Sequence, residues 1–380
     1  MRPMIQLPKT MPRWLSLLLF IGALLTAFWR APTPITPAFV PPPAAAPSLL
    51  PASFSSEMLP KVAEWSQAAS LTQLPNGRLA AAWLAGSGEG AADASIWYSM
   101  RGKEGWSKPQ PIANRESTAG GTFAHVRSVG TPVLHAEGSW LHLWYSSVGF
   151  GGAATSVINH SVSTDAGKSW FKPTRLQTSP LANISSQVRT PPLPLADGGL
   201  GLPIHHAFIA TYGEWLRLSP NGQILDKIRL PAESATLQPA VVALDAQRAL
   251  ALLRDAGPAP GKVHSTTTGD GGLHWSAAEA LPVENPNAPI ALLRLKSGRL
   301  LLAGNPQNGR AALKLWLSAD AGKTWQASRT VEAASDGGAE FAYPALLLGG
   351  DGRVHLAYTW RRHGIKHTVF SEAWLDGGQA

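Results

Sequence analysis

The residues whose types could do chemistry stand where apolar segments of the sequence begin. Six polar side chains come directly ahead of such segments, and they are Gln67, Arg127, Arg189, Gln238, Asn287 and Tyr343. This set is unusual for packing and suits an anionic ligand, because a planar guanidinium binds a carboxylate through two parallel hydrogen bonds. Such a site requires an architecture that brings the starts of these segments together.

Metal, thiol and nucleic-acid chemistry are not expected. The chain has no Cys, which excludes disulfides, cysteine nucleophiles and iron–sulfur clusters. Its 11 His show no HExxH or comparable spacing, so no metal and no cofactor are predicted. The formal charge is +8, but four basic residues precede residue 57, and residues 57–380 carry only +4. Without a concentrated basic face, binding of nucleic acid is not predicted.

Three histidines and one basic run also need an interpretation. His205 and His206, in the sequence LPIHHAF, and His125 are candidates, and one of them near the axis, such as His206, could be a general base of the kind that a sugar lyase needs. A neutral histidine bonded to backbone is the structural alternative, and we favour it. The run 361–363 (RRH) is expected to be a solvated turn at the rim, and contact with an anionic substrate is the alternative.

The elements that would position these residues are hairpins that repeat along the chain. Each hairpin has an apolar strand, a turn and a second strand with alternating apolar residues, as in SLTQLPNGRLAAAW and PALLLGGDGRVHLAY. The turns are centred on Gly77, Gly138, Gly199, Arg248, Gly298 and Gly352. Repeats of roughly 50 to 60 residues, each with about four short strands, indicate a β-propeller. We therefore predict an all-β fold with six blades over residues 57–380.

A second repeated element is an eight-residue box, Ser/Thr-x-Asp-x-Gly-x-x-Trp. The box occurs intact three times. The Asp and Trp of the three copies are Asp165 and Trp170, Asp270 and Trp275, and Asp320 and Trp325. A decayed copy, residues 99–106, has Arg101 where the Asp belongs. The Asp can accept hydrogen bonds from the turn, the Gly can adopt a positive φ, and the Trp can pack between sheets. Because the box occurs in three equivalent copies, we expect its Asp residues to have a structural role and not to form a pair of catalytic carboxylates.

The N-terminal region has a different character from the repeats. Residues 14–29 (WLSLLLFIGALLTAFW) form an uncharged run of 16 residues after Arg2, Lys9 and Arg13. This pattern predicts a signal peptide or a membrane anchor over residues 1–30. We prefer the uncleaved anchor, because no small-residue cleavage site follows the run directly. Eight Pro in residues 31–56 predict an extended, semi-rigid linker. The rest of the chain would then be exported, and it would either face the periplasm or cell exterior from the inner membrane or be secreted.

The boxes resemble the Asp-boxes of sialidases and related BNR-repeat proteins. The resemblance covers nearly all of 57–380, and it includes the segments WLAGSGEGAADASIW, ENPNAPIALLRLKSGRLLLAGN and EFAYPALLLGGDGRVHLAYTWRR. It implies a six-bladed propeller with its site at the axis. In that family three Arg bind the substrate carboxylate, a Tyr paired with a Glu is the nucleophile, and an Asp is the acid/base. Most glycoside hydrolases use a pair of carboxylates, and sialidases are an exception because their nucleophile is a Tyr.

The resemblance implies roles for individual residues. Arg254, at the end of the second strand of blade four, and Arg310, ahead of the third strand of blade five, match two of the three Arg. Tyr343 matches the nucleophile. Glu89 or Asp93, in the loop after the first hairpin, would be the acid/base. The other candidates for substrate binding are Arg127, Arg189, Gln238, Asn287 and His206.

The sequence departs from the family pattern at two positions. Gln67 lies in the stretch where the first Arg should stand, and Gln238 stands where the Glu partner of the tyrosine is expected. Gln cannot be the base for a phenol whose ordinary pKa is about 10. Glu340, three residues ahead of Tyr343, is the residue that could compensate.

Three functions remain open at this point. The first is an exo-glycosidase that acts on a terminal acidic sugar of a glycoconjugate or polysaccharide. The second is a non-catalytic glycan-binding or envelope module, which Gln238 and the missing Arg favour. The third is a polysaccharide lyase that uses His206 and Tyr343. All three predict a glycan partner, and the leader predicts contact with a membrane.

Overall fold

In the computed structural model, the described residues are 13–30, 36–179, 183–306, 309–335 and 338–377. The chain divides into two compact units, Met1–Thr36 and Pro37–Ala380. The first unit contains helix α1 (Arg13–Arg30), which covers the apolar run of the leader. Within the described ranges, no helix combines the length and the apolar character needed to cross a membrane.

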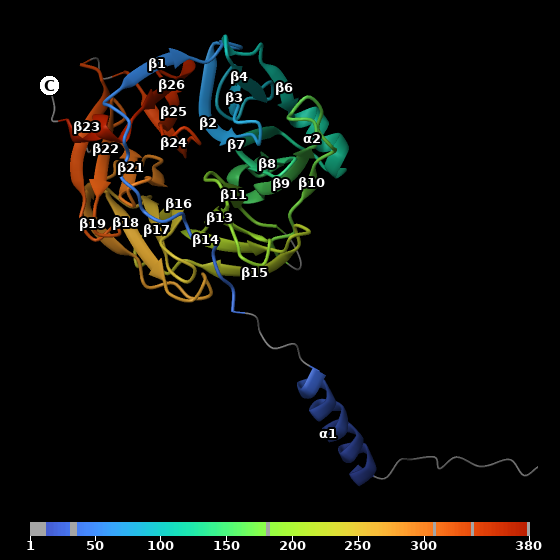
Figure 1. Cartoon of the computed structure of the whole chain (residues 1–380). Coiled ribbons are helices and arrows are strands. Elements are labelled where there is room, and N and C mark those ends of the chain that lie inside the picture. The colour runs from blue at the N-terminus through green and yellow to red at the C-terminus, as the bar shows by residue number, and fades with distance from the viewer. Residues whose placement is uncertain (1–12, 31–35, 180–182, 307–308, 336–337, 378–380) are drawn as a thin grey trace, which may run out of the picture. The chain divides into compact units, whose positions relative to one another are not determined.

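The second unit consists of six antiparallel sheets arranged as a ring (Figure 1). This confirms the predicted six-bladed β-propeller. The first three blades contain β2 (Trp65–Gln73), β3 (Leu79–Gly86), β4 (Ser95–Gly102), β5 (Gly105–Trp106) and β6 (Gln110–Ala113); β7 (Ser128–Glu137), β8 (Trp140–Val148), β9 (Val157–Ser163) and β10 (Thr174–Arg175); and β11 (Ser186–Val188), β12 (Leu193–Pro194), β13 (Leu200–Ala207), β14 (Thr211–Leu218) and β15 (Ile224–Arg229). The last three contain β16 (Thr236–Ala243), β17 (Ala249–Asp255), β18 (Lys262–Thr268) and β19 (Glu279–Glu284); β20 (Ala291–Arg294), β21 (Leu300–Gly304), β22 (Ala312–Ser318) and β23 (Gln326–Ala333); and β24 (Phe341–Leu348), β25 (Val354–Trp360), β26 (Gly364–Phe370) and β1 (Phe54–Met58).

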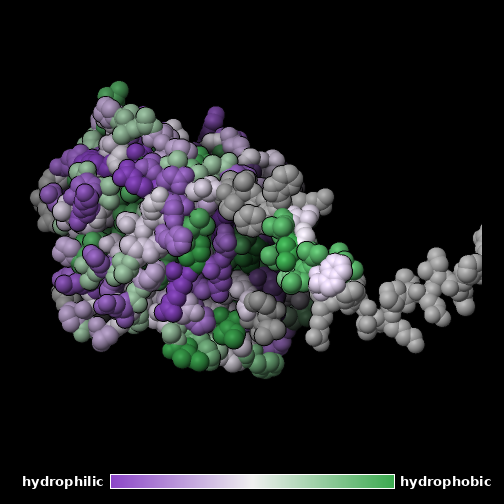
Figure 2. Space-filling model, turned by 90° about the horizontal axis from the view of Figure 1, so that it is seen from below, coloured by the Kyte–Doolittle hydropathy of each residue, from purple (hydrophilic) through white to green (hydrophobic). Residues whose placement is uncertain are grey.

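The core lies between neighbouring blades. Strands such as β3 (LAAAWLAG) and β21 (LLLAG) are buried along almost their whole length, because a blade packs on both of its faces. One cluster joins Leu84 of blade one to Leu143 of blade two, and another joins Leu315 of blade five to Leu356 of blade six. On the face shown in Figure 2, hydrophilic and hydrophobic residues alternate in small groups.

The ring is closed by a strand from the N-terminal side. Strand β1 pairs antiparallel with β26, from Phe54 opposite Phe370 to Met58 opposite Lys366, and completes blade six. The propeller therefore begins before residue 57. This pairing covers the edge of the last blade, which an open ring would leave unpaired.

Most of the predicted linker, residues 31–56, belongs to the propeller unit, because that unit starts at Pro37. Phe39 is fully buried between Trp215 and Leu195. The backbone NH of Phe39 donates to Ala246 O over 2.8 Å, and that of Ala46 donates to Lys296 O over 2.9 Å. Proline prevents this segment from joining a sheet interior, but it leaves such single contacts available.

Two short helices and a 3-10 turn complete the described structure. Helix α2 (Arg115–Thr122) follows β6, and its first turn is closed by reciprocal bonds between Asn114 and Ser117. Helix α3 (Glu372–Asp376) follows β26. A 3-10 turn covers Gly152–Thr155.

Each intact box is a turn that the Asp carboxylate organises. Asp165 Oδ1 accepts from the backbone NH of Ser169 over 2.9 Å, and Asp165 Oδ2 accepts from the Ser169 hydroxyl over 2.6 Å. Hydrogen bonds from Ser169 are the main reason that the pKa of Asp165 falls to about 2. The indole NH of Trp170 donates to Gly167 O over 3.2 Å. The boxes at Asp270 and Asp320 repeat these bonds.

Candidate active site at the ring axis

The site lies where the inner strands of the blades begin. Four of these strands have a bulge in their pairing with the second strand, and three of the bulges contain Ala68, Gln238 and Tyr343. These residues have φ values of 59°, 50° and 55°. A left-handed conformation costs a residue other than Gly roughly 1–2 kcal/mol. Strain of this kind is often found at functional sites, where it re-aims a side chain.

Tyr343 is buried among guanidinium groups. The guanidinium carbon of Arg310 lies 5.4 Å from the centroid of the Tyr343 ring, and that of Arg189 lies 5.6 Å from it. Arg254 also interacts with Tyr343, through charge and a side-chain hydrogen bond. Blades three, four and five thus each supply one Arg to the tyrosine of blade six.

Arg254 is oriented by two amide side chains. Its Nε donates to Asn287 Oδ1 over 2.8 Å, and its Nη1 donates to Gln238 Oε1 over 3.0 Å. Burial lowers the pKa of Arg254, and the charge of Arg310 acts in the same direction, whereas Tyr343 and Glu89 oppose it. Gln238 therefore acts here as an acceptor that holds an Arg.

Glu340 lies between two Arg residues. Its Oε1 is 3.0 Å from Nη1 of Arg310, and its Oε2 is 2.6 Å from both Nε and Nη2 of Arg362. Burial acts to lower the pKa of Arg310, but the charges of Tyr343 and Glu340 outweigh it, and the pKa is raised. Both carboxylate oxygens of Glu340 thus accept hydrogen bonds from Arg residues, and one of these, Arg310, faces Tyr343.

Arg189 is the most deeply buried of the three Arg residues around Tyr343, with 3% of its surface exposed. Its Nη2 donates to Pro344 O over 3.0 Å, and its Nε has no hydrogen-bond partner among the described residues. Burial lowers the pKa of Arg189 to about 10. A buried guanidinium with an unpaired donor is costly for stability and favours a nearby negative charge.

The two candidates for the acid/base occupy different positions. Glu89 is exposed, and it lies near enough to Arg254 for its charge to raise the pKa of that Arg. Asp93 instead closes its own loop, because it accepts hydrogen bonds from the backbone NH and the hydroxyl of Ser87 over 3.0 and 2.7 Å. Hydrogen bonding from Ser87 lowers the pKa of Asp93. The structure therefore leaves Glu89 as the better placed of the two.

Three of the expected lining residues take no part in the contacts described above. In blade one, Ala68, and not Gln67, stands at the bulge position that Gln238 and Tyr343 occupy in blades four and six. Arg127 is exposed, and its described bond is from its backbone NH to Val148 O. His206 stacks on Tyr212, with 4.8 Å between ring centroids.

The structure distinguishes the two neighbouring histidines of β13. His205, and not His206, is buried next to the site, and burial together with the charge of Arg254 lowers its pKa to about 3. The alternation of side chains along a strand predicts that only one of this pair faces inward, but it does not say which one. Arg362 lies in an exposed turn, as predicted, and from there it also binds Glu340.

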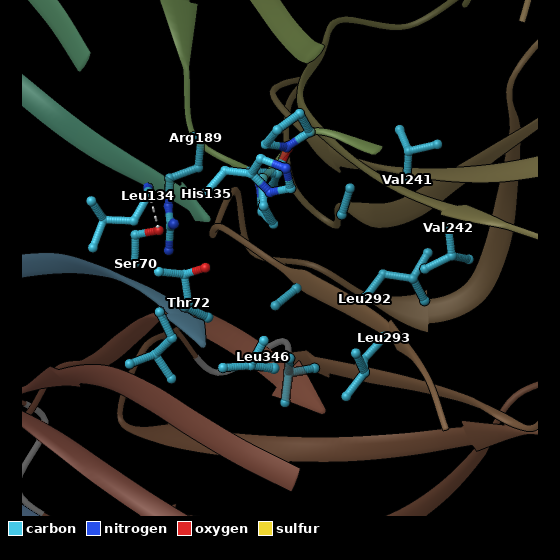
Figure 3. Close-up of a pocket in the computed structure, with 18 of the residues that line it drawn as sticks. Ser70, Thr72, Leu134, His135, Arg189, Val241, Val242, Leu292, Leu293 and Leu346 are labelled. Carbon is cyan, nitrogen blue, oxygen red and sulfur yellow. Dashed lines mark hydrogen bonds between the residues drawn. The ribbon is translucent and has the colours of Figure 1, made fainter. Parts of the chain in front are cut away.

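An axial cavity of about 240 Å³ lies along the inner strands next to Arg189 (Figure 3). Arg189, His135, Ser70 and Thr72 lie on one side of the view, and aliphatic side chains such as Leu292 lie on the other. Tyr343, Arg254 and Arg310 are not part of its lining. The cavity therefore adjoins the cationic cluster and shares Arg189 with it.

The cluster is suited to an organic acid. Three guanidiniums around one phenol attract a carboxylate and place it next to a potential nucleophile. Among the described residues, no group of three or more His, Asp or Glu side chains could hold a metal ion. The chemistry that this site could perform therefore depends on Tyr343, the Arg residues and the carboxylates near them.

The family follows from a match that covers most of the ring. The family model of the BNR repeat-like domain matches residues 77–356. The chain belongs to the BNR repeat-like family. In this BNR repeat-like protein the match extends from the first hairpin turn to the last one, and so it includes all three intact boxes. No curated protein sequence matches the chain.

Solved structures similar to this BNR repeat-like protein include sialidases. A protein of unknown function from Dyadobacter fermentans has 16% identity and a TM-score of 0.66, and the match covers 83% of this chain and 97% of that one. A Hadza microbial sialidase has the same identity and TM-score, with 82% and 66% covered. An intramolecular trans-sialidase from Ruminococcus gnavus has 13% identity and a TM-score of 0.59, with 83% and 96% covered. At such identities the likeness establishes the fold.

Proposed function

We propose that the axial site binds the carboxylate of a terminal acidic sugar and hydrolyses its glycosidic bond. The observation that carries this proposal is the buried Tyr343 held among Arg189, Arg254 and Arg310. The sialidases among the structural neighbours support the same class of substrate. Arg189 supplies a third guanidinium to this cluster, although the Arg expected ahead of blade one is absent.

In this proposal each group has its own task. Arg254, oriented by Gln238 and Asn287, and Arg310, oriented by Glu340, bind the carboxylate of the sugar. The oxygen of Tyr343 attacks the anomeric carbon from beside this clamp, and its proton passes to water. Glu89 donates a proton to the departing oxygen and later activates water, as one carboxyl group does in retaining glycosidases.

A second function is favoured by a specific observation. The phenol needs a base, but Gln238 is an amide, and both oxygens of Glu340 bind Arg residues. The site could therefore bind an acidic glycan without cleaving it. The lyase alternative has no such support, because the ring of His206 packs on Tyr212.

Hydrolysis of aryl glycosides of acidic and neutral sugars by the full chain tests the proposal. We expect turnover of an acidic-sugar glycoside, and a loss of at least about 100-fold in kcat/KM for Tyr343→Phe and for Arg254→Ala, because each removes a group that acts in the transition state. Arg175→Ala, at an exposed position of β10, is the matched control and should change nothing.

Two results would redirect the proposal. Unchanged hydrolysis in both variants would exclude the assigned roles. If no glycoside is cleaved, but an acidic glycan binds and Arg254→Ala abolishes that binding, the site is a non-catalytic glycan-binding site.

A further inference from the structure

In the blades that carry a box, the box fills the junction with the preceding blade. The ring of Trp170 in blade two lies 6.0 Å from that of Tyr98 in blade one, and the ring of Trp275 in blade four lies 5.8 Å from that of Trp215 in blade three. The box glycines are also packed against the preceding blade. A Cβ would overlap a side chain of that blade at Gly167, Gly272 and Gly322.

Blade three has no box at the corresponding turn. Leu218 ends β14 as the first residue of each intact box ends its strand, but residues 218–225 read LSPNGQIL. Leu225 stands in the place of the Trp, and 47% of its surface is exposed. Gly222 keeps the left-handed φ of a box glycine, at 75°, but no atom lies within 4 Å of the position of its Cβ. The space that a box fills elsewhere is open here.

A cavity of about 560 Å³ occupies this junction between blades two and three. Blade two contributes Trp140, His142, Trp144 and His160, and blade three contributes residues 218–222. The volume is in the range of roughly 300–1,000 Å³ that is typical of pockets for small ligands. Strand β7 begins at the end of the ring that holds the axial site and finishes at Glu137, so the cavity opens at the opposite end.

The floor of the cavity is a flat aromatic surface. Nδ1 of His142 and Nε2 of His160 are 2.9 Å apart, and the two rings are parallel within 2°. Both rings stack on Trp144, at centroid distances of 5.3 and 4.7 Å. Trp140 extends this surface towards solvent and is half exposed. Burial lowers the pKa of His160 to about 4 and also lowers that of His142, so the floor is uncharged at neutral pH.

Blade six contains the same histidine pair in a covered form. Nδ1 of His355 and Nε2 of His367 are 3.0 Å apart, and their rings are parallel within 6°. There the ring of Trp106, from the decayed box of blade one, lies 5.4 Å from that of His367. The histidine pair of blade two has the same geometry, but no aromatic side chain among the described residues of blade three covers it as Trp106 covers the pair of blade six.

The lining selects the class of ligand. A flat aromatic floor packs against the C–H face of a sugar ring, and polar groups at the rim can bind its hydroxyls. The carboxylate of Glu137 is 3.7 Å from Nε2 of His142, and none of the described residues that line the cavity is Lys or Arg. The negative charge of Glu137 therefore favours a neutral sugar over an anionic one. We propose that the cavity between blades two and three is a binding site for a neutral pyranose unit of a glycan.

Titration of the full chain with neutral disaccharides (lactose, maltose and cellobiose) tests this proposal. Calorimetry and tryptophan fluorescence should detect binding of at least one of them, with weaker binding of glucuronate than of glucose. Trp140→Ala should weaken binding at least tenfold, because it removes the exposed part of the floor. Leu225→Trp should abolish binding by restoring the missing box residue. Phe171→Ala, which alters an exposed aromatic residue of blade two outside the cavity, is the matched control and should bind normally.

The outcomes separate this site from the axial one. Tyr343→Phe should leave binding of the neutral sugar unchanged, so failure of the axial proposal does not affect it. Absence of binding by all neutral sugars up to 10 mM, or normal binding by both Trp140→Ala and Leu225→Trp, would overturn the proposal. Occupation of the cavity by an aromatic side chain of another protein, seen in a complex, would also overturn it.

Discussion

Glu340 illustrates how one carboxylate can set the geometry of a cationic site. It pairs with Arg310, which faces Tyr343, and with Arg362, which comes from the turn between β25 and β26. The side chain of Glu340 is only 10% exposed, so this pairing occurs in surroundings where water screens it weakly. We therefore expect Glu340 to act as a positioning residue for Arg310 in the proposed site.

Glu340→Gln should lower the free energy of unfolding by about 1–3 kcal/mol, because it leaves two cations with a weaker acceptor in a partly buried place. It should also raise the KM for an acidic-sugar glycoside more than it lowers kcat, because Arg310 loses its orientation. Urea unfolding and steady-state kinetics measure the two effects. Arg362→Ala is the comparison, and it should cost only about 0–1 kcal/mol because Arg362 is 54% exposed. Equal losses in both variants would contradict this account.

The residues of the axial cluster could be predicted only in part. The resemblance implied that Tyr343 lies near Arg254 and Arg310, and in the structure they are close together. Each of them stands at or next to the end of a strand, and such positions can be read from the sequence. Gln67 stands one position ahead of the residue that corresponds to Gln238 and Tyr343, and only the strand register shows that this residue is Ala68. The contact of Arg189 with Pro344 joins residues 155 positions apart, and no local pattern encodes it.

At the scale of elements, blade one shows how a lost box residue is replaced. Arg101 stands where the Asp of the box belongs, and Glu57 of β1 supplies the missing carboxylate. Oε1 of Glu57 accepts from Nε of Arg101 over 2.6 Å and from the indole NH of Trp106 over 3.1 Å. The closing strand therefore also completes the turn of the neighbouring blade.

Glu57→Ala should lower the free energy of unfolding at pH 7 by about 1–3 kcal/mol, because Arg101, Trp106 and His367 all lose an acceptor. Burial acts to raise the pKa of Glu57, but hydrogen bonds from Arg101 and His367 outweigh it, and the pKa is lowered. The stabilisation is therefore fully present above pH 4.5 and is lost as the pH falls through the lower folded-state value. Urea titrations at pH 7 and below pH 4 test this. The exposed Glu104→Ala is the control, and an effect as large as that of Glu57→Ala would refute the assignment.

The strands were the most predictable elements. The six hairpins follow from alternating apolar residues around Gly-containing turns, which are local signals. The packing of residues 37–53 was not predicted, because a proline-rich sequence reads as a spacer when its partners are unknown. Phe39 is the one large apolar side chain at the start of that segment, and it is buried on Trp215.

At the scale of the whole molecule, the ring buries histidines in more than one blade. His135, His160 and His355 lie between or within blades, and burial lowers the pKa of each to about 4. These histidines are neutral in the folded ring at neutral pH. Unfolding would return each of them to an ordinary pKa of about 6.5.

Stability should therefore fall as the medium becomes acidic. Between about pH 6.5 and pH 4 the unfolded chain binds protons that the folded chain does not, so the free energy of unfolding decreases as the pH decreases. Urea unfolding at intervals from pH 8 to pH 4 measures the slope. A His142→Asn, His160→Gln double variant should show a shallower slope, because it removes one buried pair. Constant stability of the wild type between pH 7 and pH 5 would be inconsistent with neutral buried histidines.

The sequence by itself determined the repeat, the hairpins, the boxes and hence the six-bladed ring, because turns and strands depend on residues a few positions apart. Only the tertiary structure decided which polar groups meet at the axis, where residues 37–53 pack and which junction between blades is left open. Those contacts join segments tens to hundreds of residues apart, and they depend on bulges, strand register and the shapes of facing side chains. The polar strand starts indicated an anion site, and the ring established which three Arg residues surround Tyr343.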